Sequence, residues 1–284
     1  MKTLRHYFPM FGVLLFWGFS WPSAKMALRF MSPYILSLLR FSMGALFLLL
    51  FTQRPIFTPR VVAGALLNGA LFVTLVNKAV SMSTNPALAS VLVYTQPLFV
   101  MLLLRCSGEK LRGTQIFGVL LAFFGVVVSA GSVHFDRGAL MAIFSGFVWA
   151  VGIVYYRKYL KNEDVFRFNT ALNILSAISV IPLALFVDVR FRFSFEAMSW
   201  GLLTAFVSQV AGFLLWFSSL KNLGAETTSA VSLLVPVWAY IFTYLFMAQI
   251  PKPAQIIGSL TTLLGVFLSQ VETFARQSSE QGPQ

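Results

Sequence analysis

The chain has 284 residues, of which 58% are hydrophobic and 11% are charged, and its formal net charge is +12. Soluble domains carry roughly 25% charged residues, so this composition argues against a water-soluble globule and indicates a membrane protein. The basic residues are spread between apolar runs, which favours membrane orientation over nucleic-acid binding. With one cysteine and two histidines, the chain lacks an intramolecular disulfide and the residues for zinc or histidine-triad hydrolysis.

Hydrophobic runs separated by proline, glycine and charged residues predict an all-α membrane protein with ten transmembrane helices. The first segment has the basic start of a secretory signal peptide, but its long apolar stretch carries Trp17 and Trp21, which favours a retained helix. A polar tail follows the last helix, and we expect it to be disordered. The helices are expected at residues 7–27, 33–51, 61–79, 86–104, 113–131, 138–156, 168–187, 199–220, 225–248 and 253–271.

The distribution of Lys and Arg among the loops predicts the orientation of the chain. With the N-terminus inside, 13 of the 21 basic residues fall on the cytoplasmic side and 6 on the opposite side. Lys and Arg in short loops are retained on the cytoplasmic side of the membrane. We therefore expect a multi-pass protein of the prokaryotic inner membrane with both termini in the cytoplasm.

The two halves of the sequence resemble each other at a nearly constant offset. Trp17 is echoed by Trp149, Pro97 is echoed by Pro236, and "GVLLAFFGVVVS" from Gly118 is echoed by "GSLTTLLGVFLS" from Gly258. Glycine and proline are common in membrane helices, but several matches in one order favour duplication. Five helices in each half make the repeat inverted, because five is odd. The predicted units are residues 1–131, 132–271 and a cytoplasmic tail, 272–284.

Several of these segments resemble the EamA repeat of the drug/metabolite transporter superfamily. They are "WGFSWPSAK", "ALASVLVYTQPLF" and "GEKLRGTQIFGVLLAFFGV" in the first half, and "FSGFVWAVGIVYYRK", "AETTSAVSLLVPVWAYIF" and "PAQIIGSLTTLLGVFLS" in the second. The resemblance implies ten helices in two inverted five-helix halves, a substrate cavity between them and export of small metabolites such as amino acids. The sequence departs from this pattern where Ala248 and Gln249 replace a Gly-Glu pair, and where the seventh helix lacks a counterpart of Arg40.

Two prolines are expected near the middle of the membrane. Pro97 and Pro236 each lie 11 residues into a predicted helix, or about 16 Å deep at the helical rise per residue. A proline there removes a backbone hydrogen bond, kinks the helix and frees a carbonyl that can face a cavity, although a kink used only for packing explains it equally well. The candidate kink and gating residues are Pro22, Pro97 and Pro236.

Two tryptophans are also expected at mid-depth, although tryptophan normally prefers the membrane interface. We interpret Trp17 and Trp149 as cavity-lining residues that offer stacking surface, with packing between helices as the alternative. Polar and aromatic residues at similar depth extend this set. The candidate substrate-binding residues are Trp17, Ser20, Trp21, Arg40, Tyr94, Gln96, Trp149, Asn173, Gln209, Trp238 and Tyr240.

The charged residues distinguish between classes of transporter. All nine acidic residues fall in loops, helix ends or the tail, whereas proton-coupled export of lipophilic cations needs a carboxylate within the membrane. Arg40 lies seven residues into the second helix, about 10 Å from its outer edge. We expect it to pair with helix ends, carbonyls or an anionic group of the substrate. Lys25 and Lys78 form an outer basic cluster and are expected to extend toward the headgroups.

These features predict a secondary transporter that exports small polar or zwitterionic metabolites by alternating access through a central cavity. The family resemblance makes amino acids the leading substrate class. The alternatives are a multidrug or cation exporter and a lipid-handling membrane protein. The sequence lacks a phosphate-binding nucleotide loop and an intramembrane cluster for catalysis. We therefore expect no enzymatic activity, no cofactor or metal, no nucleic-acid partner, and a monomer that contacts only its substrate and the bilayer.

The orientation can be tested with topology reporters fused after successive helices. Fusions after Ala79 and after Gly131 should report the outside, and fusions after Phe51 and after Leu104 should report the cytoplasm. Alkaline phosphatase activity paired with the fluorescence of a cytoplasmic reporter measures both sides. A cytoplasmic signal after Gly131 would remove the basis for an inverted repeat.

Overall fold

The structure is a computed structural model, and it describes residues 2–51, 54–83, 86–130, 137–250 and 252–279. Within these residues the chain forms helices and short connections, apart from one isolated antiparallel bridge between Met31 and Phe191. The predicted all-α fold is therefore confirmed. The predicted boundary at residues 131–132 and the end of the predicted tail, residues 280–284, lie outside the described residues.

Two π-helical segments interrupt the series of α-helices. Five helical stretches, some of them interrupted, are long and apolar enough to cross a membrane: 59–82, 89–106, 137–159, 165–186 and 195–232. The number of spans stays a prediction. In chain order the elements are α1 (Lys2–Ala27), α2 (Pro33–Leu49), α3 (Pro59–Ala65), η1 (Leu66–Leu71), α4 (Phe72–Met82), α5 (Pro86–Val93), α6 (Gln96–Cys106), α7 (Gly113–Ala130), α8 (Arg137–Tyr159), α9 (Val165–Phe186), α10 (Phe195–Ala205), η2 (Phe206–Gly212), α11 (Phe213–Ser232), α12 (Val235–Met247) and α13 (Pro253–Ser279).

The C-terminal helix is longer than the sequence analysis predicts. We expected disorder from residue 272, but α13 continues to Ser279. No glycine or proline interrupts the tail before Gly282 and Pro283, so the local sequence permits the helix to continue. The polarity of the tail therefore predicts disorder too early.

Two predicted helices are broken in the middle. Residues 86–104 form α5 and α6, separated by a turn at Tyr94 and Thr95, and residues 225–248 are divided by a turn at Leu233 and Leu234. Pro97 and Pro236 lie in the first turn of α6 and of α12 rather than within a bent helix. A proline is well tolerated there because first-turn amides have no intrahelical partner. The spacing between the two breaks along the chain equals the spacing between the two prolines.

The π-helical segments η1 and η2 were not predicted, and they begin at Leu66 and Phe206, almost the same spacing as that of the two prolines. Within η2, the carbonyl oxygens of Ser208 and Gln209 accept hydrogen bonds from side chains. Trp17 Nε1 donates to Ser208 O at 3.3 Å and Asn169 Nδ2 donates to Gln209 O at 3.3 Å. The π-helical turn of η2 is thus tied to α1 and α9 by these two bonds, and such turns recur at functional sites.

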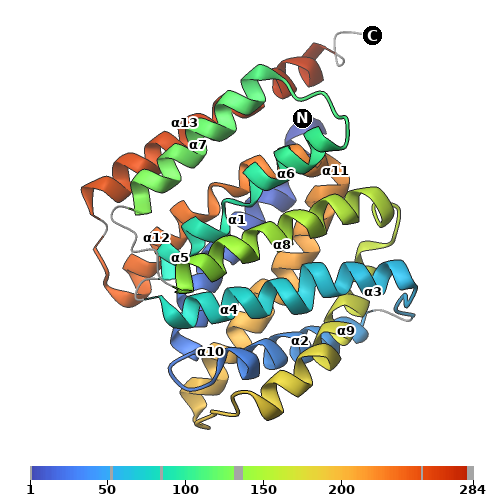
Figure 1. The fold of residues 1–284 in the computed structure, drawn as a ribbon, viewed down its shortest axis with the longest axis vertical. Coiled ribbons are helices and arrows are strands. Elements are labelled where there is room, and N and C mark those ends of the chain that lie inside the picture. The colour runs from blue at the N-terminus through green and yellow to red at the C-terminus, as the bar shows by residue number, and fades with distance from the viewer. Residues whose placement is uncertain (1, 52–53, 84–85, 131–136, 251, 280–284) are drawn as a thin grey trace.

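The helices pack around α1, which lies in the interior of the molecule (Figure 1). It contacts α10, η2, α11 and α12, while α2 packs on α9 and α4 packs on α8. The pair α7 and α13 runs along one edge (Figure 1). A Cβ atom added to Gly265 of α13 would overlap the backbone of Ala122 and the carbonyl oxygen of Gly118 in α7. The two backbones therefore approach each other closely, as small residues permit in membrane helices.

Hydrogen bonds between connections show which of them lie together at each end of the molecule. At one end, Arg167 Nε donates to the carbonyl oxygen of Arg54 at 2.8 Å. At the other end, Ser32 Oγ donates to the carbonyl oxygen of Asp188 at 2.7 Å. This grouping of loops is the one that the predicted topology requires. The assignment of the Arg54 end to the cytoplasm stays a prediction.

The close approach of α7 and α13 predicts a stability effect. Gly265→Ala should separate the two helices and lower the free energy of unfolding by about 1–3 kcal/mol, the usual cost of overpacking. Gly113→Ala is the matched control, because its Cβ would meet nothing within 4 Å. Thermal unfolding of the detergent-solubilised variants measures the difference. Equal melting temperatures for the two variants would contradict this packing.

Candidate functional site

A pocket in the interior, which we call the central pocket, encloses about 460 Å³, including the part open to the outside. All of its lining residues except Trp149 and Phe213 precede residue 131, so the N-terminal half supplies most of the wall. The pocket extends toward Ala24 and Val80, close to the end that carries Ser32. Its lining residues are Trp17, Ser20, Trp21, Ala24, Arg40, Phe72, Val73, Val76, Asn77, Val80, Val93, Tyr94, Trp149 and Phe213.

Aromatic rings form one wall of the central pocket, with Trp149 at their centre. Its ring stacks on Phe72 with 4.7 Å between centroids and meets Tyr94 at 5.5 Å, Trp17 at 5.4 Å and Trp216 at 5.0 Å. Trp149 is only 1% exposed. Trp17 and Trp149 therefore meet across the two halves, and they pack between helices as well as line the pocket. Phe72 and Trp216 were not among the residues predicted from the sequence.

The indole N–H groups of this wall differ in their hydrogen bonding. Trp17 Nε1 is bonded to η2, whereas Trp149 Nε1 is buried without a partner among the described residues. Ser20 Oγ donates to the carbonyl oxygen of Trp17 at 2.8 Å. An unpaired buried donor is costly, so the N–H of Trp149 lacks the compensation that the N–H of Trp17 has.

Arg40 carries a buried positive charge at the central pocket and is 6% exposed. Its Nη1 donates to Asn77 Oδ1 at 2.6 Å and its Nη2 donates to Gln209 Oε1 at 2.9 Å, while Nε has no partner. Asn77 Nδ2 in turn donates to Ser37 Oγ at 2.7 Å. Within the described part of the chain no carboxylate forms an ion pair with Arg40. Amide dipoles alone offset its charge, which leaves the pocket electropositive.

Asn173 and Gln209 are absent from the wall of the central pocket. Asn173 Nδ2 donates to the carbonyl oxygen of Asn169 at 2.8 Å, and its Oδ1 occupies the space that a side chain on Gly44 would fill. Gln209 is connected to the site through Arg40 alone, and its Nε2 has no partner among the described residues. Gln209 therefore supports the guanidinium from outside the wall, whereas Asn173 bonds within its own helix.

Three other predicted site residues, Gln96, Trp238 and Tyr240, are also absent from the wall of the central pocket. Gln96 Nε2 donates to Ser229 Oγ at 2.9 Å and so connects the two broken helices. The partly exposed ring of Trp238 meets Phe11 at 6.3 Å. Tyr240 is buried elsewhere in the core.

The two predicted outer lysines have separate partners. Lys25 Nζ donates to the carbonyl oxygens of Val80 and Ser83 where α4 ends. Lys78 Nζ lies 5.8 Å from the ring centroid of Tyr34. A cation at a helix C-terminus compensates its free carbonyls, which explains the position of Lys25.

The three predicted gating prolines have different environments. Pro22 lies inside α1, where it follows Trp21 of the central pocket, and Pro236 is buried at the start of α12. Pro97 lines a second pocket of about 360 Å³, which we call the Glu226 pocket. Its lining residues are Pro97, Val100, Met101, Leu111, Gln115, Val119, Glu226, Ser229, Ala230 and Ser269.

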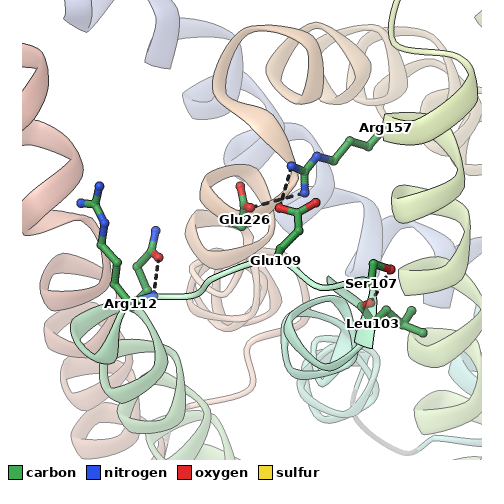
Figure 2. A network of polar contacts seen from close by, with 7 residues as sticks. Leu103, Ser107, Glu109, Arg112, Arg157 and Glu226 are labelled. Atoms are coloured by element: carbon green, nitrogen blue, oxygen red, sulfur yellow. Dashed lines mark hydrogen bonds and ion pairs between the residues drawn. The ribbon is translucent and has the colours of Figure 1, made fainter. Parts of the chain in front are cut away.

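Beside the Glu226 pocket, Arg157 lies between two carboxylates (Figure 2). Its Nη2 is 2.8 Å from Glu109 Oε2 and its Nη1 is 3.4 Å from Glu226 Oε1. Glu109 follows α6, Arg157 ends α8 and Glu226 belongs to α11, so this triad connects the two halves of the chain. The side chains are between 30% and 36% exposed. The sequence places both glutamates in loops or helix ends but does not pair them with Arg157.

Comparison with known proteins identifies the family. The EamA-like transporter family matches residues 5–131 and again residues 136–270. The chain belongs to this family. The EamA-like chain is 29% identical to the uncharacterized transporter YyaM of Bacillus subtilis, over 94% of this chain and 93% of that one. It is 24% identical to a probable amino-acid metabolite efflux pump of Escherichia coli, over 90% and 92% of the two chains.

A solved crystal structure has the same fold. It aligns with a TM-score of 0.79 at 18% identity, over 96% of this chain and 98% of that one. The predicted resemblance is thus confirmed, and EamA-like membership together with the long apolar helices makes the chain a multi-pass membrane transporter. The family and its relatives are named for transport rather than for catalysis.

The aromatic wall predicts that Trp149 acts as a packing centre. Trp149→Ala should lower the free energy of unfolding by about 3–5 kcal/mol, because four ring contacts are lost. Trp149→Phe should retain most of this stability, since the indole N–H has no partner to lose. Thermal unfolding in detergent measures both variants. Equal melting temperatures for the Ala and Phe variants would contradict a stabilising role of the ring contacts.

Proposed function

We propose that the protein exports small zwitterionic metabolites, and that amino acids with apolar or aromatic side chains are its substrates. Arg40 carries this proposal, because it is a buried guanidinium at the wall of a pocket without a carboxylate partner among the described residues. A substrate carboxylate would supply the missing negative charge through charge-assisted hydrogen bonds. The free Arg40 Nε provides a donor for such a bond.

The remaining wall of the central pocket suits the rest of an amino acid. Trp17, Trp21, Phe72, Tyr94 and Trp149 offer apolar and stacking surface of the kind that binds organic side chains. The name of the Escherichia coli relative, a probable amino-acid metabolite efflux pump, supports the same substrate class.

We further propose transport by alternating access between two inverted five-helix repeats in the inner membrane. Two separate family matches support the repeat, as do the helix breaks and π-helical segments that recur at nearly the same spacing in the second half. The central pocket approaches one end of the molecule and the Glu226 pocket approaches the other. The Arg157 triad and the Gln96–Ser229 bond then close the predicted cytoplasmic side in this conformation.

The alternative substrates fit the pocket less well. A lipophilic cation would meet the charge of Arg40, and the described wall of the central pocket holds no carboxylate to bind it. A lipid would need an apolar path, whereas Arg40 and Asn77 make part of this wall polar.

Counterflow in proteoliposomes tests the substrate class. Vesicles that contain the purified protein and unlabelled phenylalanine should accumulate labelled phenylalanine from outside. Vesicles loaded with a lipophilic cation such as tetraphenylphosphonium should not accumulate labelled tetraphenylphosphonium. Counterflow of the cation without counterflow of any amino acid would contradict the proposed function.

The substitution Arg40→Lys should specifically weaken the binding of carboxylates. Lysine keeps the charge but cannot donate from a planar fork to Asn77, Gln209 and a ligand together. The affinity for labelled 3-phenylpropanoate should fall about tenfold, a difference of about 1.4 kcal/mol. Arg190→Lys is the control, because Arg190 is exposed, follows the end of α9 and does not line the central pocket. Unchanged affinity in a folded Arg40→Lys protein would remove Arg40 from the substrate site.

A further inference from the structure

The two pockets have opposite electrostatic character. The central pocket holds the charge of Arg40 without a neighbouring carboxylate in the described structure. In the triad beside the Glu226 pocket, two carboxylates share one guanidinium, which leaves an excess of one negative charge. The side chain of Arg112, the other labelled base nearby, points away from these carboxylates (Figure 2).

Glu226 is the member of the triad that is able to change partner. Arg157 is held at 2.8 Å by Glu109, whereas its distance to Glu226 is 3.4 Å, beyond the usual length of a charge-assisted hydrogen bond. Glu226 lines the pocket and Glu109 does not. If a ligand cation took Glu226, Arg157 would keep its bond to Glu109 and no charge would be left unpaired.

The local backbone directs Glu226 into the pocket. Gly224 has a φ of +82°, which ends one helix and allows another to begin at Ala225. Glu226 and Ser229 are then three residues apart on one helical face, and both line the pocket. Gln96 holds the hydroxyl of Ser229 from the opposite broken helix.

The two pockets lie on either side of the break between α5 and α6. Val93 and Tyr94, before or at the break, line the central pocket, and Pro97 and Val100, after the break, line the Glu226 pocket. A ligand that moves from one pocket to the other therefore passes the Gln96–Ser229 contact.

We propose that the Glu226 pocket binds the primary ammonium group of the substrate, with Glu226 exchanging Arg157 for this ammonium. The inference rests on the proposed function, since a zwitterion has a carboxylate for the central pocket and an ammonium group for the Glu226 pocket. Val100, Met101 and Val119 supply apolar surface for its side chain. The exchange also releases the link between α8 and α11, so arrival of an amine loosens the closed end of the molecule.

Three probes with a common phenyl ring test this site on the purified full-length protein: phenethylamine, 3-phenylpropanoate and phenylalanine. Glu226→Gln should weaken phenethylamine binding about ten- to hundredfold, as expected for loss of a charged hydrogen-bond partner. Its affinity for 3-phenylpropanoate should stay within about twofold. Arg157→Gln should strengthen phenethylamine binding, because it leaves Glu226 without a competitor. Glu196→Gln, which removes an exposed carboxylate from the start of α10, should change neither affinity.

Several outcomes overturn the ammonium site. The first is that phenethylamine does not bind the parental protein. The second is that a folded Glu226→Gln variant binds phenethylamine with unchanged affinity. The third is that Glu226→Gln and Arg157→Gln weaken phenethylamine binding equally, which indicates a structural ion pair. Failure of the proposed function has a different signature. In that case Arg40→Lys leaves 3-phenylpropanoate binding intact and phenylalanine shows no counterflow, while the effect of Glu226→Gln on phenethylamine persists.

Discussion

The compensation of one buried guanidinium organises the interior of this transporter. An arginine within the hydrocarbon region costs about 2.5–3.5 kcal/mol on insertion scales, so Arg40 requires polar partners. Asn77 from α4 and Gln209 from η2 supply them at 2.6 and 2.9 Å, and they bring together elements of both halves. Amide oxygens offset the charge only in part, because they carry dipoles rather than full charges. The same contacts that stabilise the fold therefore leave the charge of Arg40 without a carboxylate partner among the described residues.

Interrupted helices also contribute polar groups to the interior. In η2 the carbonyl oxygens of Ser208 and Gln209 accept hydrogen bonds from the side chains of Trp17 and Asn169. The pair α7 and α13 contrasts with these elements, because its glycines permit close and continuous packing along one edge. The continuous pair and the irregular helices thus occupy different parts of the molecule, and the helix breaks lie beside the two pockets.

Several residues of the central pocket were predictable from the sequence because their signals are local. The mid-depth position of Trp17 and Trp149 and the depth of Arg40 follow from counting residues along a helix. Both tryptophans and the arginine line the central pocket, and Pro97 and Pro236 mark the breaks. Trp238 and Tyr240 were expected in the same wall at similar depth but lie elsewhere. Depth alone does not identify the helix face that a side chain occupies.

By itself the sequence determined that the chain is a helical membrane protein, where its apolar segments lie, and which few polar residues share their depth. Only the tertiary structure decided that Asn77 and Gln209 hold Arg40, and that Arg157 is shared by Glu109 and Glu226. The physical reason is that lipid and the protein interior are both apolar. Hydropathy therefore places a segment in the membrane but does not distinguish its lipid-facing side from its buried side. Pairings between helices far apart in the sequence depend on that choice of face, and packing alone settles it.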